Sequence, residues 1–136
     1  MSYSLSFETE HRFNAGEPGI SIPITLQYGD VISPFTAKLD TGSSFCIFER
    51  IHGEMLGLDV ERGERQQIGT AIGSFITFGH EVTISALGFS FDSVVYFAQD
   101  ENFRRNVLGR HGWLNKIKLG LIDYDGLLYL SHYDNE

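Results

Sequence analysis

The chain has 136 residues, 42% of them hydrophobic, and its 18 Asp and Glu residues outnumber its 10 Lys and Arg residues to give a net charge of −8. This length suits one domain, with a core spanning about residues 20–130, and leaves little room for a second. The acidic excess argues against nucleic acid as a partner, because nucleic-acid-binding proteins contact phosphates mainly through basic side chains.

The sequence carries no sign of a membrane span or of export. No apolar run approaches the ~20 residues that a membrane-spanning helix needs. The first residues lack the basic end and the apolar stretch of a signal peptide. Cys46 is the only cysteine and cannot form a disulfide within the chain. We therefore expect a cytoplasmic protein.

Strand patterns dominate the first third of the chain. Residues 20–28 alternate apolar and polar side chains, which is typical of a half-buried strand. Pro23 within this stretch indicates an edge position or a bulge. A second strand is expected over about 33–39. A short apolar run at 45–48 is followed by apolar side chains at helical spacing over 49–58, which predict one short helix.

The rest of the chain alternates between strands and turns. Strands are predicted over 74–79, 80–86, 89–98, 107–109, 117–123 and 127–131. A short helix is expected over 112–116, and the Asp-Gly pair at 125–126 is a strong hairpin signal. Many short strands with two short helices predict a mainly-β barrel or sandwich.

The sharpest local feature is the segment Asp-Thr-Gly-Ser at residues 40–43. A carboxylate follows an apolar strand, and Gly42 allows the backbone to turn closely. The hydroxyls of Thr41 and Ser43 can hold the turn or bond the carboxylate. A simpler interpretation is an Asx turn in which Asp40 bonds only its own backbone. An isolated Asp-Thr-Gly arises by chance in roughly 3% of chains of this length, so the motif alone is a moderate signal.

Two later segments carry further signals. Residues 67–76 place a tip of Gly, Thr and Ala between two stretches of strand pattern. This segment is either a surface hairpin or a lid that closes over an extended ligand. Residues 106–110 read Asn-Val-Leu-Gly-Arg just before the expected short helix. This segment is either an ordinary strand, turn and helix start, or an arginine that braces the loop at Asp40.

In this order and at this spacing, the three motifs resemble those of the retropepsin-like, single-domain aspartic proteases of retroviral and bacterial type. The resemblance covers about residues 20–130 and implies a closed acid-protease barrel with one or two short helices. It also implies hydrolysis of a peptide or protein substrate without metal or cofactor. The five histidines show no metal-ligand spacing, and Cys46 is expected to be a buried small hydrophobic residue.

An aspartic protease needs two carboxylates around one water molecule, yet Asp-Thr-Gly occurs once in this chain. Asp125 is the only acidic residue followed directly by glycine, and it lies in an expected hairpin turn without the apolar lead-in. The second carboxylate should therefore be Asp40 of another copy, across a two-fold axis. We expect a homodimer.

The resemblance implies a role for each motif residue. The catalytic residues would be Asp40, Thr41, which braces the partner loop, and Gly42, which presents its carbonyl to substrate. The substrate-binding residues would be Ser43, Ile68, Gly69, Thr70, Ala71, Ile72 and Gly73. Gly109 would pack behind the active-site loop with Arg110 near it. Ser43 could donate to the carboxylate and favour its charged form, so we expect an acidic optimum.

Two departures from the family pattern leave alternatives open. Ser44 stands where retroviral members carry an aspartate that pairs with the arginine, so Arg110 must bond backbone carbonyls, another carboxylate or a partner subunit. The chain ends of retroviral members pair in an interface sheet, but residues 1–14 and 131–136 here are more polar than that role suggests. The alternative function is a catalytically inactive protein of this fold that acts as a dimerisation or peptide-binding module.

Overall fold

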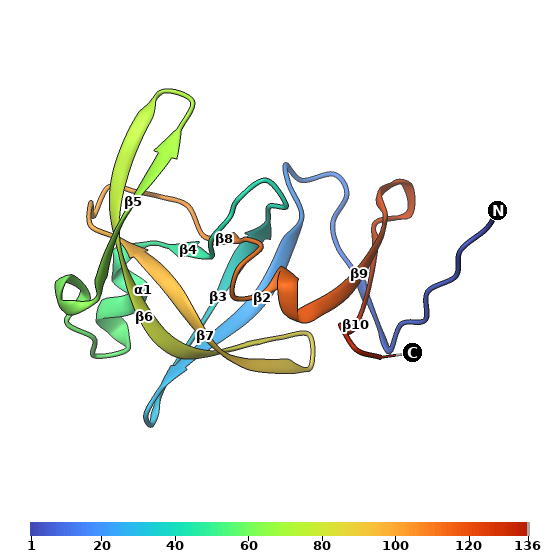
Figure 1. The fold of residues 1–136 in the computed structure, drawn as a ribbon, viewed down its shortest axis with the longest axis horizontal. Coiled ribbons are helices and arrows are strands. Elements are labelled where there is room, and N and C mark those ends of the chain that lie inside the picture. The colour runs from blue at the N-terminus through green and yellow to red at the C-terminus, as the bar shows by residue number, and fades with distance from the viewer. Residues whose placement is uncertain (136) are drawn as a thin grey trace.

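The computed structural model describes residues 1–135, which fold mainly into strands arranged in two sheets (Figure 1). The larger sheet, in the order β2-β3-β8-β4-β7-β6-β5, contains β2 (Ser21–Tyr28), β3 (Val31–Leu39), β4 (Ile47–Phe48), β5 (Glu64–Thr70), β6 (Gly73–Ala86), β7 (Phe89–Ala98) and β8 (Val107–Leu108). The smaller sheet, β1-β10-β9, contains β1 (Thr9–Arg12), β9 (Ile117–Ile122) and β10 (Leu127–His132). The helical segments are α1 (Arg50–Met55) and the 3₁₀ turns η1 (Val60–Arg62), η2 (Leu114–Lys116) and η3 (Asp123–Asp125). The expected mainly-β architecture is confirmed.

Pairing of β2 on both of its sides closes the larger sheet into a barrel. Strand β2 pairs with β3 from Ser21 onward and with β6 only from Ile24 onward. Pro23 therefore lies where β2 has a neighbour on one side alone, which suits a residue that has no backbone N–H to donate. The position agrees with the edge strand that the sequence indicates.

The barrel interior is filled by the side chains that alternate inward along the strands. Its largest fully buried members include Ile22, Leu26, Phe48, Phe97, Leu108 and Trp113. Cys46 is also buried, and burial raises the pKa of its thiol to about 11. The thiol is therefore protonated at neutral pH, as expected for a small core residue.

Both expected helices are shorter in the structure. The first is α1, which ends where Gly57 adopts a left-handed backbone with φ of 82°. The second, expected over 112–116, is only the 3₁₀ turn η2. Gly112 has a φ of 102°, so a helix cannot begin at that residue. No helix within residues 1–135 has the length and apolar character needed to cross a membrane.

Helix α1 packs on β3 through a histidine whose environment disfavours its charged form. The His52 ring stacks on Phe35 with ring centroids 3.7 Å apart, and its buried Nδ1 has no hydrogen-bond partner within residues 1–135. Burial lowers the pKa of His52, while Glu49, with a carboxylate oxygen 3.8 Å from Nε2, opposes the shift. The folded state therefore binds a proton at His52 less readily than the unfolded chain does.

This difference predicts a loss of stability on acidification. As pH falls below the ordinary His pKa of 6.5, the unfolded chain takes up the proton first, so stability drops until the lowered pKa of the folded state is passed. Urea unfolding midpoints at neutral pH and near pH 5 measure the drop, and His52→Phe should reduce it. An equal drop in the variant would assign the effect to other groups.

The strands expected over 74–79 and 80–86 are one continuous strand, β6. Gly79 makes no turn there. A Cβ at this position would lie 2.8 Å from the ring of Tyr96, so the glycine allows close approach of the neighbouring strand. The long β6 is what lets the β5–β6 hairpin extend beyond the barrel (Figure 1).

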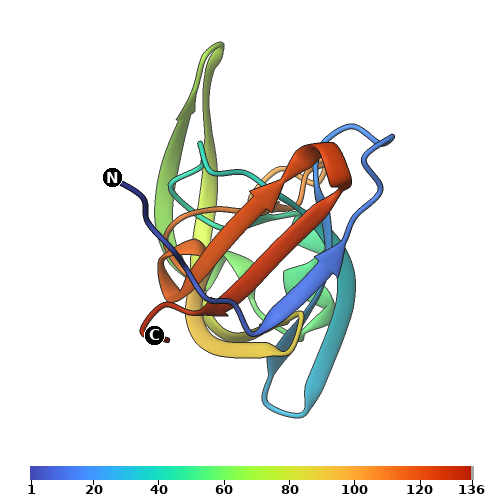
Figure 2. The same ribbon diagram turned by 90° about the vertical axis from the view of Figure 1, so that its right-hand side faces the viewer.

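The smaller sheet joins the two ends of the chain (Figure 2). Strand β1, which the sequence analysis missed, pairs with β10 from Thr9↔Leu130 to Arg12↔Leu127. Strands β9 and β10 form the hairpin that the Asp-Gly pair predicts, with Gly126 in a left-handed conformation at φ of 66°. The first and last strands of one chain, β1 and β10, therefore form backbone hydrogen bonds with each other.

Candidate active site

Asp40 follows β3 directly and is fixed by contacts on both sides. Its backbone N–H donates to the carbonyl oxygen of Leu108 at 2.9 Å, next to the parallel pairing of β3 with β8. Its Oδ1 accepts the backbone N–H of Gly42 at 2.9 Å. Oδ2 accepts no hydrogen bond from residues 1–135. The carboxylate thus makes an Asx turn and keeps one oxygen open to a ligand.

The loop that follows Asp40 rests on Gly109. The N–H of Arg110 donates to the carbonyl oxygen of Ser43 at 2.9 Å. A Cβ on Gly109 would lie 2.1 Å from the carbonyl oxygen of Phe45 and 2.7 Å from that of Ser43. Only glycine fits at this contact, which places Gly109 behind the loop.

Ser43 does not contact the Asp40 carboxylate. Its backbone N–H donates to the carbonyl oxygen of Asp40 at 3.1 Å, and its Oγ donates to the carbonyl oxygen of Phe45 at 2.7 Å. The tight turn therefore directs the hydroxyl along the loop. The expected donation from Ser43 to the carboxylate is wrong, and the argument for an acidic optimum that rested on it falls with it.

Arg110 supports the loop through its backbone and not through its side chain. The exposed guanidinium forms no hydrogen bond or ion pair with residues 1–135. It lines a shallow depression with Thr41, which is exposed at the tip of the active-site loop. Within the described residues, neither a backbone carbonyl nor a carboxylate pairs with the Arg110 side chain.

The segment expected to be a lid is the projecting β5–β6 hairpin. Ile68 pairs with Phe75, Gly69 with Ser74 and Thr70 with Gly73. The turn itself is therefore Ala71 and Ile72, and Gly69 lies in the strand rather than at the tip. In Figures 1 and 2 the hairpin rises on the same side of the molecule as the β3–β4 loop.

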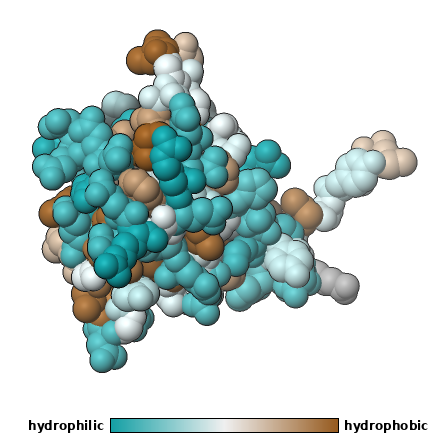
Figure 3. Space-filling model, turned by 60° about the vertical axis from the view of Figure 1, so that its left-hand side comes forward, coloured by the Kyte–Doolittle hydropathy of each residue, from teal (hydrophilic) through white to brown (hydrophobic). Residues whose placement is uncertain are grey.

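The tip of this hairpin is apolar and has no contacts that bury it. Ile72 is 99% exposed, and Figure 3 shows hydrophobic colour at the end of the projecting hairpin. At the third residue pair below the turn, the Phe75 ring stacks on Phe103 with centroids 5.0 Å apart. The sequence analysis did not identify Phe103, which links the hairpin to the segment before β8.

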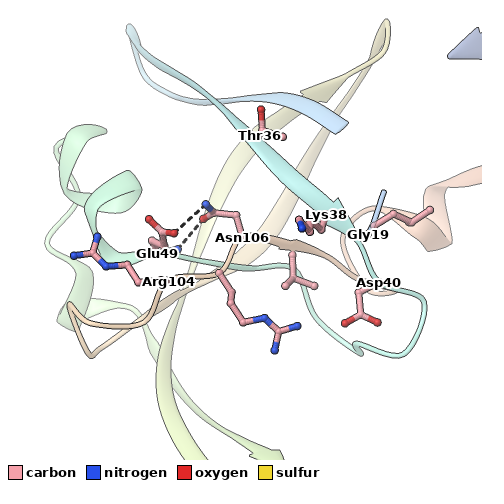
Figure 4. Close-up of a pocket in the computed structure, with 10 residues that line it drawn as sticks. Gly19, Thr36, Lys38, Asp40, Glu49, Arg104 and Asn106 are labelled. Carbon is pink, nitrogen blue, oxygen red and sulfur yellow. Dashed lines mark hydrogen bonds between the residues drawn. The ribbon is translucent and has the colours of Figure 1, made fainter. Parts of the chain in front are cut away.

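A cavity of about 480 Å³ opens beside Asp40 (Figure 4). It is lined by Gly19, Thr36, Lys38, Leu39, Asp40, Glu49, Arg104, Arg105, Asn106 and Val107. Asn106 holds its wall together. Its Oδ1 accepts the N–H of Glu49 at 3.0 Å, its Nδ2 donates to the Glu49 carboxylate at 3.3 Å, and its carbonyl oxygen accepts the N–H of Lys38.

The sequence analysis missed the basic residues of this cavity, although Arg104 and Arg105 stand directly before the 106–110 motif. Their adjacency was the available signal, but nothing in the sequence placed Lys38 beside them. Among residues 1–135, no group of three or more His, Cys, Asp or Glu side chains is arranged to hold a metal ion.

A closed barrel, an Asp-Thr-Gly-Ser loop seated on a glycine and a projecting hairpin on the same side define an acid-protease fold of the retropepsin-like kind. Among solved structures, the chain is similar to EIAV protease in complex with the inhibitor HBY-793, with a TM-score of 0.53 and 24% sequence identity over 69% of this chain and 84% of that chain. No protein-family model and no curated protein matches the sequence. The likeness establishes the fold.

Proposed function

We propose that the chain is an aspartic endopeptidase that acts as a homodimer. The observation that carries this proposal is the Asp40 carboxylate, fixed on one oxygen by Gly42 and open on the other, at the strand end of an acid-protease fold. Aspartic protease chemistry needs two such carboxylates, and Asp-Thr-Gly occurs once per chain. A two-fold axis through the loop would bring the second Asp40 from an identical partner.

In the proposed reaction, the two Asp40 carboxyl groups hold one proton between them, because two like charges so close cannot both ionise. One carboxylate takes a proton from the bound water as its oxygen attacks the peptide carbonyl carbon. The protonated carboxyl donates to the carbonyl oxygen. The C–N bond then breaks as the nitrogen takes the proton that the first carboxylate removed from water, and the pair again holds one proton.

The surroundings of Asp40 suit this chemistry. An extended peptide between the dyad and the β5–β6 hairpin would pair with backbone groups in the manner of a strand. Closure of the hairpin would exclude water from the reacting atoms. Thr41 and the unpaired Arg110 guanidinium share one depression next to the catalytic loop, and we assign this face to the partner subunit.

Cleavage of an unstructured peptide library tests the proposal. We expect internal cleavage at mildly acidic to neutral pH, a specific activity that rises with enzyme concentration as pairs form, and no activity in the Asp40→Asn variant. A stable dimer that binds peptides without cleaving them would overturn the enzyme proposal and favour the inactive peptide-binding module. Activity from a strict monomer in sedimentation experiments would contradict the shared dyad.

A further inference from the structure

The cavity beside Asp40 is basic although the chain as a whole is acidic. Of the chain's 10 Lys and Arg residues, three line this one cavity: Lys38, Arg104 and Arg105. Its volume of about 480 Å³ falls within the range of small-ligand sites, about 300–1,000 Å³. The acidic side chains in its lining are Asp40 and Glu49.

The positive charge of the cavity is not cancelled by these two acids. Glu49 accepts a hydrogen bond from Asn106 and lies 3.8 Å from His52, so it is directed into the wall. In the proposed dimer the two Asp40 carboxyls share a proton and carry about one negative charge between them. Three cations per chain therefore exceed the negative charge that faces the open space.

The three basic side chains keep hydrogen-bond donors that are free to bind a ligand. The Lys38 ammonium donates to the carbonyl oxygen of Pro18 at 2.5 Å and keeps two further donors. Arg104 and Arg105 are exposed and form no hydrogen bond or ion pair with residues 1–135. In Figure 4, Lys38 lies near Asp40 at the end of β3, and Arg104 lies across the cavity beside Glu49.

The position of the cavity connects these donors to the substrate. Lys38 lies near the end of β3 and Asp40 follows the strand directly, and both line the same cavity. A peptide bound in extended form across Asp40 points alternate side chains to opposite sides. A side chain next to the cleaved bond that points toward β3 would then enter the cavity, because Asp40 itself forms part of its lining.

We propose that this cavity selects a side-chain carboxylate, from Asp or Glu, at a substrate position next to the cleaved bond. Lys38, Arg104 and Arg105 are then specificity-determining residues, and the inference rests on the proposed peptidase function. Guanidinium groups suit this role because their planar N–H pairs match the geometry of a carboxylate. A free C-terminal carboxylate has the same chemistry as a side-chain carboxylate. The experiment distinguishes the two by using peptides whose C-termini are amidated.

Paired peptides that differ only by Glu or Gln next to the cleaved bond test the proposal, both with amidated C-termini. We expect kcat/KM to be about tenfold higher for the Glu peptide near pH 6, since hydrogen bonds to charged groups are the stronger ones. The ratio cancels the pH dependence of the enzyme's own groups. It should fall toward one as pH drops through the ordinary Glu pKa of about 4.3 and as salt is raised.

Substitutions in the cavity should lower this ratio. Lys38→Gln, Arg104→Gln and Arg105→Gln each remove one cation, and Arg105→Glu should shift the preference toward a Lys peptide. Arg62→Gln is the matched control. It removes one positive charge from an exposed ion pair with Asp59 at 3.1 Å, outside the cavity. The control should leave the ratio unchanged, and an equal fall in the control would overturn the assignment.

The outcomes separate this inference from the proposed function. Equal cleavage of the Glu and Gln peptides would overturn the specificity and leave the peptidase intact. If no peptide is cleaved, non-cleavable hydroxyethylene analogues of the two peptides still test the cavity by calorimetry: tighter binding of the Glu analogue supports it and equal binding overturns it. If carboxylate recognition appears only with peptides that have a free C-terminus, the cavity binds that terminus, and the assignment to a side-chain carboxylate is overturned.

Discussion

The Asp40→Asn variant is expected to lose about a thousandfold or more of its peptidase kcat/KM while folding and pairing like the wild type. The amide has nearly the shape of the carboxylate and can still accept the Gly42 N–H that bonds Oδ1 at 2.9 Å. It cannot take a proton from water, and general acid–base catalysis contributes about 10²–10⁴ in rate. Circular dichroism and sedimentation should show an unchanged fold and dimer.

Mixtures of the two forms give a sharper measurement of the shared site. When chains pair at random, only pairs of two wild-type chains are active, so an equal mixture keeps about a quarter of the wild-type activity at the same total concentration. A decline to one half would show that each chain carries a complete site. That result would overturn the dyad built from two Asp40 residues.

Gly109→Ala is expected to destabilise the protein by about 3 kcal/mol, the upper end of typical overpacking costs, or more. The added Cβ would lie 2.1 Å from the carbonyl oxygen of Phe45, so the active-site loop would have to lift from the backbone beneath it. This movement breaks the bond from the Arg110 N–H to Ser43. Urea unfolding measures the effect, and activity should fall with it.

Gly69→Ala is the control for this substitution. A Cβ at Gly69 meets no atom within 4 Å, and its backbone is not in the left-handed region. The same chemical change should therefore leave the free energy of unfolding within a few tenths of a kcal/mol of the wild-type value. If Gly109→Ala were as stable as Gly69→Ala, the loop would not be seated on Gly109 as described.

Much of the barrel could be predicted from the sequence because its strands bury one face each, and the resulting alternation is local. Strand β1 could not be predicted in this way. Thr9–Arg12 is polar and shows no alternation, and its pairing is fixed by β10 at the far end of the chain. The limits of α1 and η2 depended on left-handed glycines, whose conformation the sequence permits but does not specify.

The candidate site was predictable where backbone geometry left no choice of residue. Gly109 is such a position, since any side chain would collide with the loop. Ser43 was not, because a hydroxyl in a tight turn has several acceptors within reach. The basic cavity could not be predicted from the sequence, because the parallel pairing of Lys38 with Val107 brings together residues that are far apart along the chain.

The pairing of β1 with β10 inside one chain has a consequence for control of the proposed enzyme. Strands β1 and β10 already pair within one chain, so these two strands need no partner to complete their pairing. Dimerisation would then be separate from folding, and the pairing of two folded chains would decide how much active enzyme is present. The abundance of such a protease would then control its activity, which would rise as the square of the amount made while dimers are scarce.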